Sequence, residues 1–313
     1  MTQPPALISR DGTPASRYSF GTMQFGGRAD ADQSRAMYDA CRAAGITFFD
    51  TAHVYNKGAS ETLLGEFAGP ERDKLVIATK CGMEGGCGAE NIAHQFDESR
   101  QRLGMDHVDI LYLHRWDGEV DLEESFGALA ELKQAGKISH VGVSNYAAWQ
   151  VMKAARVAAG FELAISILQP MYNLVKRQAE VEILPMAASE GFHVVPYSPL
   201  GGGLLTGKYA AGRGGRLLED ENYKARYGLG WMHEAAAALA EIGRELGVSP
   251  ATLAVAWAAR HPAVTGPILS ARNVEQLRPS LDAIGYEMPD DLYARITALT
   301  PAPAPATDRL EEA

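Results

Sequence analysis

The chain has 313 residues, of which 46% are hydrophobic and 22% charged, and this balance excludes disordered, collagen-like and fibrous proteins. The 29 Lys and Arg against 39 Asp and Glu leave a formal charge of −10, the wrong sign for binding nucleic acid. No window reaches the roughly 18 apolar residues of a membrane span, and the first residues do not form a signal peptide. We therefore expect a cytoplasmic protein without a membrane partner, in which Cys41, Cys81 and Cys87 are free thiols.

Short β-type runs alternate with longer helical patterns almost to the end of the chain. The expected strands are 19–23, 46–50, 75–80, 108–114, 138–145, 163–169, 193–198 and 267–270. The clearest helical patterns lie at 32–44, 89–103, 122–135, 147–158, 177–190, 232–246 and 250–260. Eight such βα units predict an α/β protein with a (β/α)8 TIM barrel in one domain over residues 1–300, with a doubly wound open sheet as the alternative.

Two segments stand outside this repeat. Residues 199–230 are rich in glycine and tyrosine, and irregular stretches of this length are usually lids or binding loops. Residues 301–313 are rich in Pro and Ala and then acidic, so we expect a disordered tail.

Most of the expected strands end in a polar residue. In a parallel barrel these ends meet at one face, which is where barrel enzymes place their reactive groups. The residues concerned are Asp50, Lys80, His114, Asn145, Gln169, Ser198 and Ser270. We therefore predict an active site at this face.

Four residues could act together there. Burial of Lys80 is costly unless Asp50 is its partner. A nearby ammonium favours phenolate, so we expect a lowered pKa for Tyr55, and His114 could orient a substrate oxygen. The set would polarise and protonate a carbonyl but contains no nucleophile, so the reaction needs a hydride donor such as a nicotinamide cofactor.

Several motifs of this chain resemble those of the aldo-keto reductases, including the branch that contains potassium-channel β subunits. They are FDTAHVY at 49–55, SETLLGE at 60–66, LH at 113–114, GVSN at 142–145 and YSPL at 197–200. The resemblance covers residues 19–285. It implies a (β/α)8 barrel, NAD(P)H-dependent reduction of aldehydes or ketones, Tyr55 as acid/base, Asp50 and Lys80 as its tuning pair, and His114 as orienting residue.

The same resemblance implies a cofactor lying across the barrel mouth. Its implied contacts are Gly21, Thr22, Met23, Asp50, Ser144, Asn145, Gln169, Tyr197, Ser198, Pro199, Leu200, Lys208, Ser270, Arg272, Gln276 and Ser280. Arg272 is placed for a ribose 2′-phosphate and favours NADPH, because a guanidinium binds phosphate in bidentate fashion. Relatives usually have Gly at Ser270 and Asn at Ser280, which leaves NADH as an alternative.

Other signals in the sequence have simpler interpretations. Residues 202–208 resemble a phosphate-binding P-loop, but Tyr209 replaces the Ser or Thr that would bind magnesium. The histidines lack metal-ligand spacing, and we expect no metal. His53 could face the substrate or be a loop residue, and Trp116 could line the substrate pocket or belong to the core. Cys81 and Cys87 are either packing residues or redox sensors.

Three functions therefore remain. The leading prediction is an NADPH-preferring oxidoreductase that converts an aldehyde, ketone or sugar-like carbonyl and its alcohol into each other. A cofactor-binding regulatory subunit is the second, and a lyase or isomerase with Lys80 as Schiff-base amine is the third. The substrate, the physiological direction and the oligomeric state do not follow from the sequence.

Overall fold

The computed structural model describes residues 6–209, 220–309 and 311. Its centre is a sheet of eight parallel strands in the order β7-β6-β5-β4-β3-β2-β1-β8. The strands are β1 (Ser19–Gly21), β2 (Phe48–Asp50), β3 (Val76–Cys81), β4 (Val108–Leu113), β5 (Ile138–Ser144), β6 (Ile165–Gln169), β7 (His193–Val194) and β8 (Ile268–Leu269). Each predicted strand is confirmed, and most are shorter than predicted.

Backbone hydrogen bonds bring the two ends of this sheet together. The amide of Thr265 donates to the carbonyl of Val194 at 2.9 Å, and the amide of Ile268 donates to the carbonyl of Pro196 at 2.9 Å. These bonds join the segment of β7 to that of β8, so the chain forms a (β/α)8 barrel and not a doubly wound open sheet. Strand β7 is shorter than predicted because Pro196 has no amide hydrogen to donate to a ladder.

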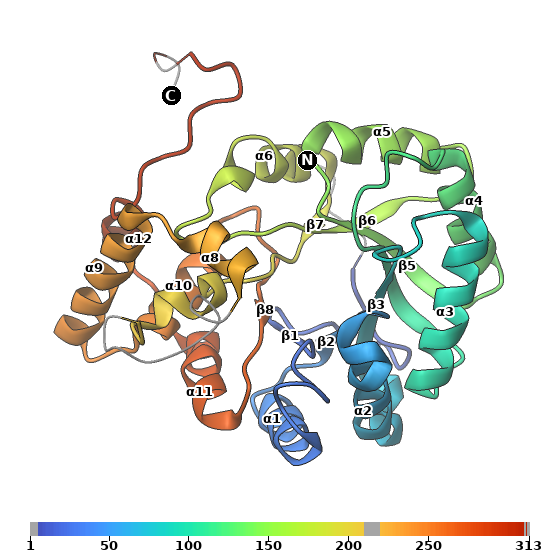
Figure 1. The fold of residues 1–313 in the computed structure, drawn as a ribbon, viewed down its shortest axis with the longest axis horizontal. Coiled ribbons are helices and arrows are strands. Elements are labelled where there is room, and N and C mark those ends of the chain that lie inside the picture. Colours follow the sequence, from blue (N-terminus) through green and yellow to red (C-terminus); the bar gives the residue numbers. More distant parts are fainter. Residues whose placement is uncertain (1–5, 210–219, 310, 312–313) are drawn as a thin grey trace.

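The helices lie outside the strands (Figure 1). They are α1 (Ala31–Ala43), α2 (Ala59–Ala68), α3 (Ala89–Leu103), α4 (Leu122–Gln134), α5 (Ala148–Ala159), α6 (Ile183–Glu190), α8 (Glu221–Tyr227), α9 (Gly230–Leu246), α10 (Pro250–Arg260), α11 (Val274–Asp282) and α12 (Asp290–Thr297). Short 3-10 helices are η1 (Tyr55–Gly58), η2 (Gly69–Lys74), η3 (Gln178–Glu180), η4 (Gly201–Thr206) and η5 (Ala283–Gly285).

Local sequence explains where several helices begin and end. Asp30 caps α1 by accepting a hydrogen bond from the amide of Gln33 at 2.8 Å, and Ser249 caps α10 before Pro250. The helix predicted over 177–190 is broken into η3 and α6, because Pro185 cannot continue a helix from the preceding turn. The stretch 199–230, predicted as irregular, contains η4 and α8, and its residues 210–219 lie outside the described part.

The barrel interior is filled by apolar side chains. Its cluster comprises Leu7, Phe48, Val76, Ala78, Ile110, Tyr112, Ile167, Val195 and Ile268. Gly142 makes room for the Tyr112 ring, since a Cβ at Gly142 would lie 2.4 Å from Tyr112 Cδ1. The interior is therefore a packed core, and the chemistry must lie at one of its ends.

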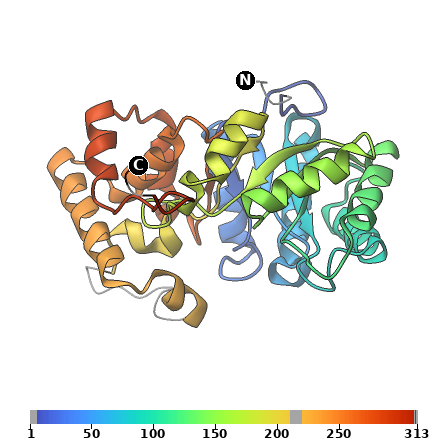
Figure 2. The same ribbon diagram turned by 90° about the horizontal axis from the view of Figure 1, so that it is seen from above.

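The two ends of the barrel differ. In Figure 2 the N-terminal segment (blue, top) and the α8 segment (gold, bottom) lie at opposite ends of the molecule.

Residues 301–309 leave the barrel without helix or strand (Figure 1). None of the helices in the described ranges has the length and apolarity needed to cross a membrane.

Close backbone packing makes one glycine before β8 irreplaceable. A Cβ at Gly266 would lie 1.6 Å from the carbonyl oxygen of Arg17. We expect Gly266→Ala to lower the free energy of unfolding by about 3 kcal/mol, because the backbone segments that precede β1 and β8 must separate. Urea denaturation measures this loss. Gly69→Ala is the control, since a Cβ at Gly69 meets nothing within 4 Å; equal stability of both variants would contradict the analysis.

Candidate active site

The strand register brings the four predicted residues to one end of the barrel. Asp50 is the last residue of β2, Lys80 lies near the end of β3, and His114 directly follows β4. Tyr55 begins η1, just after β2, and its ring centroid is 5.9 Å from that of His114. The predicted set is therefore assembled in space, although its catalytic role remains a prediction.

An ion pair lies at the centre of the group. The Lys80 ammonium donates to Asp50 Oδ1, to the Thr51 carbonyl at 2.7 Å and to the Tyr55 hydroxyl at 3.5 Å. Asp50 Oδ2 accepts from Gln169 Nε2 at 2.9 Å. Both charged side chains are fully buried. The contacts leave the Tyr55 hydroxyl as the part of this network that can reach a substrate.

Burial and charge act in opposite directions on these groups. Burial opposes the charge on Lys80, but Asp50 and Tyr55 raise the pKa of Lys80 above its usual value. Burial raises the pKa of Asp50, and Lys80 and Gln169 oppose that rise. The expected lowered pKa of Tyr55 is wrong in its net direction: burial raises it, and the Lys80 ammonium only offsets part of the rise. Tyr55 is thus protonated and ready to donate.

His114 is held in its neutral form. Burial, with smaller effects of Lys80 and Arg115, lowers the pKa of His114 to about 3. Among the described residues its buried Nδ1 atom has no hydrogen-bond partner. A neutral imidazole in this position can donate one hydrogen bond to a substrate oxygen without adding charge.

The turn that carries Tyr55 is fixed by contacts that the sequence did not suggest. Asn56 and Lys57 adopt φ values of 50° and 56°, in the left-handed region. Asn56 Nδ2 donates to the carbonyls of Met23 at 2.9 Å and Phe25 at 2.7 Å. These bonds tie η1 to the loop after β1 and so fix the position of the phenol.

Charged groups behind the turn support it from the other side. His53 Nε2 contacts Glu98 Oε2 at 2.6 Å, so His53 is a paired loop residue. Arg102 donates to the carbonyl of His53 at 3.0 Å and to Glu61 Oε2 at 3.3 Å. The buried Glu61 also accepts from Thr79 Oγ1 at 2.6 Å, directly before Lys80 in the chain. One network thus joins the segments of Tyr55 and Lys80.

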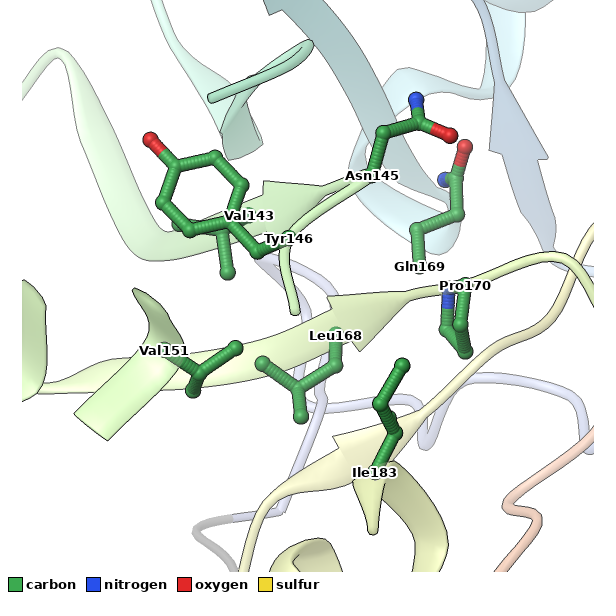
Figure 3. A pocket seen from close by; sticks show the side chains of 8 residues that line it. All are labelled: Val143, Asn145, Tyr146, Val151, Leu168, Gln169, Pro170 and Ile183. Carbon is green, nitrogen blue, oxygen red and sulfur yellow. The ribbon is translucent and has the colours of Figure 1, made fainter. Parts of the chain in front are cut away.

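Residues expected to hold a nicotinamide lie beside the four. Tyr197 donates to Asn145 Oδ1 at 2.7 Å, and Asn145 Nδ2 donates to the carbonyl of His114 at 2.9 Å. Ser144 Oγ donates to the carbonyl of Gln169 at 2.9 Å. Figure 3 shows that Asn145 and Gln169 direct their amide groups to the same side of the strands. Two adjacent amides and an aromatic ring suit a planar carboxamide.

The same figure shows how these amides are supported from below. Apolar side chains from β5, β6, α5 and α6 surround a void of about 10 Å³, no more than a single water could fill. Val143, Leu168 and Ile183 line it. The void is a small packing defect and is too small for a substrate, which must bind elsewhere at this end of the barrel.

The loop after β7 fits a pyrophosphate. Ser198 has φ 60°, and Gly201, Gly202 and Gly203 have φ values of 56°, 65° and 95°. A Cβ at Gly203 would lie 2.9 Å from the Lys208 ammonium. Successive backbone amides in such conformations form a concave surface for anions, and Lys208 adds a positive charge. Pro199 is buried and Leu200 half-buried within this loop.

The segment after β8 carries the residues that we expect to hold the adenosine end. Asn273 caps α11 by accepting from the Gln276 amide at 2.9 Å, and the half-buried Arg272 directly precedes this helix. Ser270 is exposed. Ser280 is fully buried, and its Oγ has no hydrogen-bond partner among the described residues. The expected contact of Ser280 with a cofactor stays a prediction.

The three residues after β1 have different surroundings. A Cβ at Gly21 would lie 2.9 Å from Ile268 Cγ2, so this glycine serves the packing of β1 on β8. Thr22 Oγ1 lies 2.8 Å from Ser60 Oγ and donates to the Asp50 carbonyl at 3.2 Å. Met23 is 40% exposed. Only Met23 is thus open to a ligand through its side chain.

Trp116 belongs to an aromatic group at the ends of β4 and β5. Its ring lies 5.2 Å from that of Tyr146 and 5.5 Å from that of Trp149, and it is half-buried. Lys153 Nζ lies 6.0 Å from the Trp116 ring. Trp116 therefore packs in a partly exposed aromatic cluster. Its role as a wall of the substrate pocket stays a prediction.

The cysteine thiols are buried and the potential metal ligands are scattered within the described residues. Cys41, Cys81 and Cys87 are free and buried. Burial raises the pKa of Cys81 and raises that of Cys87 to about 11, which makes both poor redox sensors. Within the described ranges no group of three His, Cys, Asp or Glu residues could hold a metal ion.

Comparison with known proteins agrees with this site. The model of the aldo/keto reductase family matches residues 17–301, and the chain belongs to this family. A protein named "Uncharacterized oxidoreductase YrpG" of Bacillus subtilis is 31% identical over 320 residues, which cover 96% of this chain and 97% of that protein. The expected resemblance is confirmed, and family membership supports an oxidoreductase.

Other relatives differ in what their names describe. The 6-dehydroglucose reductase of Agrobacterium fabrum is 33% identical over 304 residues, covering 87% of this chain and 90% of the reductase. A probable voltage-gated potassium channel subunit beta of Oryza sativa subsp. japonica is 34% identical over 294 residues, covering 88% of this chain and 90% of the subunit. The family thus includes both enzymes and channel subunits.

The protonation of His114 can be measured directly. We expect its NMR ring resonances not to titrate between about pH 7 and about pH 5, because burial lowers its pKa to about 3. The unfolded chain binds this proton near the ordinary value of 6.5. His114 therefore lowers the free energy of unfolding as the pH falls from about 6.5 to about 3. A His114 titration midpoint near 6.5 would contradict the neutral assignment.

Proposed function

We propose that the protein is an NADPH-preferring oxidoreductase that reduces an aldehyde, ketone or sugar-like carbonyl to the alcohol, or runs the reverse oxidation. The observation that carries the proposal is the Tyr55 hydroxyl, 3.5 Å from the buried Lys80 ammonium and beside the neutral His114. A proton donor and a second hydrogen-bond donor on one carbonyl oxygen are what such a reduction needs.

The mechanism follows from these contacts. A bound reduced nicotinamide supplies the hydride that reaches the carbonyl carbon. His114 orients the carbonyl oxygen, and Tyr55 donates its proton to that oxygen as negative charge develops there. Lys80 stabilises the resulting phenolate, and Asp50 keeps the lysine charged in a buried position. In the oxidation direction Tyr55 accepts the proton from the alcohol instead.

Residues at the barrel mouth are suited to bind a nicotinamide dinucleotide. Ser144, Asn145 and Gln169 would hold the carboxamide, and Tyr197 would stack on the ring. The glycine loop and Lys208 would hold the pyrophosphate. Arg272, at the start of α11, would bind the 2′-phosphate of NADPH, because the helix N-terminus and the guanidinium both favour an anion. NADH is the alternative, because Ser270 and Ser280 stand where relatives usually have Gly and Asn.

The competing functions are less well supported. A regulatory subunit with little turnover is suggested by the channel subunits among the relatives, yet the complete set of Asp50, Tyr55, Lys80 and His114 favours turnover. A Schiff-base lyase would need an accessible, neutral Lys80, and this amine is buried and donates to three oxygen atoms. A cytoplasmic location completes the proposal and agrees with the free cysteines.

Removal of the phenol hydroxyl tests the proposed acid. We expect Tyr55→Phe to lower kcat by about a hundredfold to ten-thousandfold and to leave NADPH binding nearly unchanged, because only the proton donor is lost. Single-turnover oxidation of NADPH with a panel of aldehydes, ketones and ketosugars measures the first effect, and quenching of tryptophan fluorescence measures the second. Full activity of the variant would overturn the assignment of Tyr55.

Arg272 tests the cofactor preference. We expect Arg272→Gln to raise the Kd for NADPH by about tenfold to a hundredfold and to change the Kd for NADH little, since only NADPH carries the 2′-phosphate. Fluorescence titrations with both cofactors measure the two values. Arg278→Gln, at an exposed residue of the adjoining helix α11, is the matched control. Equal weakening of both cofactors by Arg272→Gln would remove the basis for the NADPH preference.

A further inference from the structure

Two positively charged side chains lie together beside the site of the predicted nicotinamide. Lys176 belongs to a tight turn after β6, in which its amide donates to the carbonyl of Asn173 at 2.9 Å. Its Nζ lies 6.0 Å from the ring centroid of Tyr227, and the guanidinium of Arg226 lies 5.3 Å from the ring of Tyr223. Burial, and then the proximity of Arg226, lower the pKa of Lys176. The two cations therefore repel one another.

These two cations differ from three half-buried arginines elsewhere in the structure. Arg42, Arg102 and Arg177 each form an ion pair with a carboxylate. Within residues 6–209 and 220–309, neither Lys176 nor Arg226 has a carboxylate within ion-pair distance. Two like charges without a counter-charge destabilise the fold, and such arrangements are characteristic of sites at which a ligand supplies the opposite charge.

Helix α8 is fixed so that these groups face the active site. Tyr227 is fully buried, and its hydroxyl accepts from Asn173 Nδ2 at 3.4 Å. Tyr223 packs on the glycine loop, since a Cβ at Gly202 would lie 2.7 Å from its Cδ1. Tyr223 is also close enough to Tyr55 and Tyr197 to contribute to the raised pKa of each. Arg226, stacked on Tyr223, is thus near the reacting groups and not at a distant surface.

Two carboxylates near the described mouth are already engaged by other groups. Asp50 is neutralised by Lys80. Asp117 is engaged by the amides of Cys87 at 2.8 Å and Glu119 at 2.9 Å. Arg115, exposed next to His114, adds another positive charge. Positive charges close to an open site attract anions, even in a chain with a formal charge of −10.

We propose that the substrate is a carbonyl compound that also carries a carboxylate or phosphate group, bound by Arg226 and Lys176 while its carbonyl lies against Tyr55 and His114. The inference rests on the proposed reductase function and adds the substrate class. Stacking on Tyr223 leaves the edge of the Arg226 guanidinium available for a bidentate contact with an anionic group. In the proposed function the cofactor phosphates are held by the glycine loop and Lys208, so this inference assigns Arg226 and Lys176 to the substrate and not to the cofactor.

Matched pairs of charged and neutral substrates test the inference. The first pair is para-carboxybenzaldehyde and para-formylbenzamide, which differ little in shape, and the second is glyceraldehyde phosphate and glyceraldehyde. We expect Arg226→Gln and Lys176→Gln each to lower the ratio of kcat/KM for the charged over the neutral member by roughly tenfold to a hundredfold. A larger decrease of the ratio with the first pair indicates a carboxylate substrate, and a larger decrease with the second pair indicates a phosphate substrate.

Lys224→Gln is the matched control, because Lys224 lies on the same helix in an exposed pair with Glu221. This variant should keep the wild-type ratio. An unchanged ratio of kcat/KM in Arg226→Gln would overturn the inference. Weaker NADPH binding together with an equal loss of kcat/KM for both substrates would also overturn it, and would assign the cations to the cofactor or to the fold.

A binding measurement separates this inference from the proposed function. Terephthalate and its neutral diamide are titrated into the complex with NADP⁺, with tryptophan fluorescence as the readout. If no aldehyde is reduced but terephthalate binds in preference to the diamide and this preference is lost in Arg226→Gln, the reductase proposal fails and the anion site stands. If aldehydes are reduced but neither ratio nor binding depends on Arg226, the anion site alone fails.

Discussion

The buried ion pair between Asp50 and Lys80 is the interaction on which the site depends. Two charges inside a barrel are costly, and loss of one partner alone typically destabilises a protein by about 3–5 kcal/mol. Here the ends of β2 and β3 hold both groups, while Thr51 and Gln169 satisfy their remaining hydrogen bonds. The pair therefore requires neighbouring parallel strands in fixed register, and this register in turn places the lysine under Tyr55.

The segments on the two sides of this pair are attached to the barrel in different ways. Asn56, Arg102 and Glu61 hold the turn of Tyr55 through hydrogen bonds to two other segments. These contacts fix the distance between acid and ion pair without touching a substrate. On the other side of the mouth, α8 is joined to the barrel mainly through Tyr227 and the glycine loop. The chemistry is thus built on strands and the proposed substrate recognition on a short helix, which is how barrel enzymes combine one mechanism with many substrates.

Electrostatics connects these two parts. Burial keeps Tyr55 protonated and His114 neutral, so the lysine is the positive charge nearest the reacting oxygen. The expected acidification of Tyr55 by Lys80 neglected burial, which acts on the phenol more strongly than the ammonium does. Lys176 and Arg226 lie outside this buried layer. In the proposed substrate site they bind the anionic part of the ligand while the buried groups act on the carbonyl.

The sequence by itself determined the eight strands and three of the four candidate residues, Asp50, Lys80 and His114, because hydrophobic periodicity and polar strand ends are local features. The closure of the sheet into a barrel, which the sequence predicted beside an open sheet, was decided by hydrogen bonds between the segments of β7 and β8. The sequence also sufficed for the family, through short motifs of contiguous residues. Only the tertiary structure decided that His53 pairs with Glu98, that Ser280 is buried, and that Lys176 lies at the Tyr227 ring while Arg226 lies at the Tyr223 ring. These contacts join residues dozens of positions apart through loops and helix faces, and no local pattern encodes which side chains then face one another.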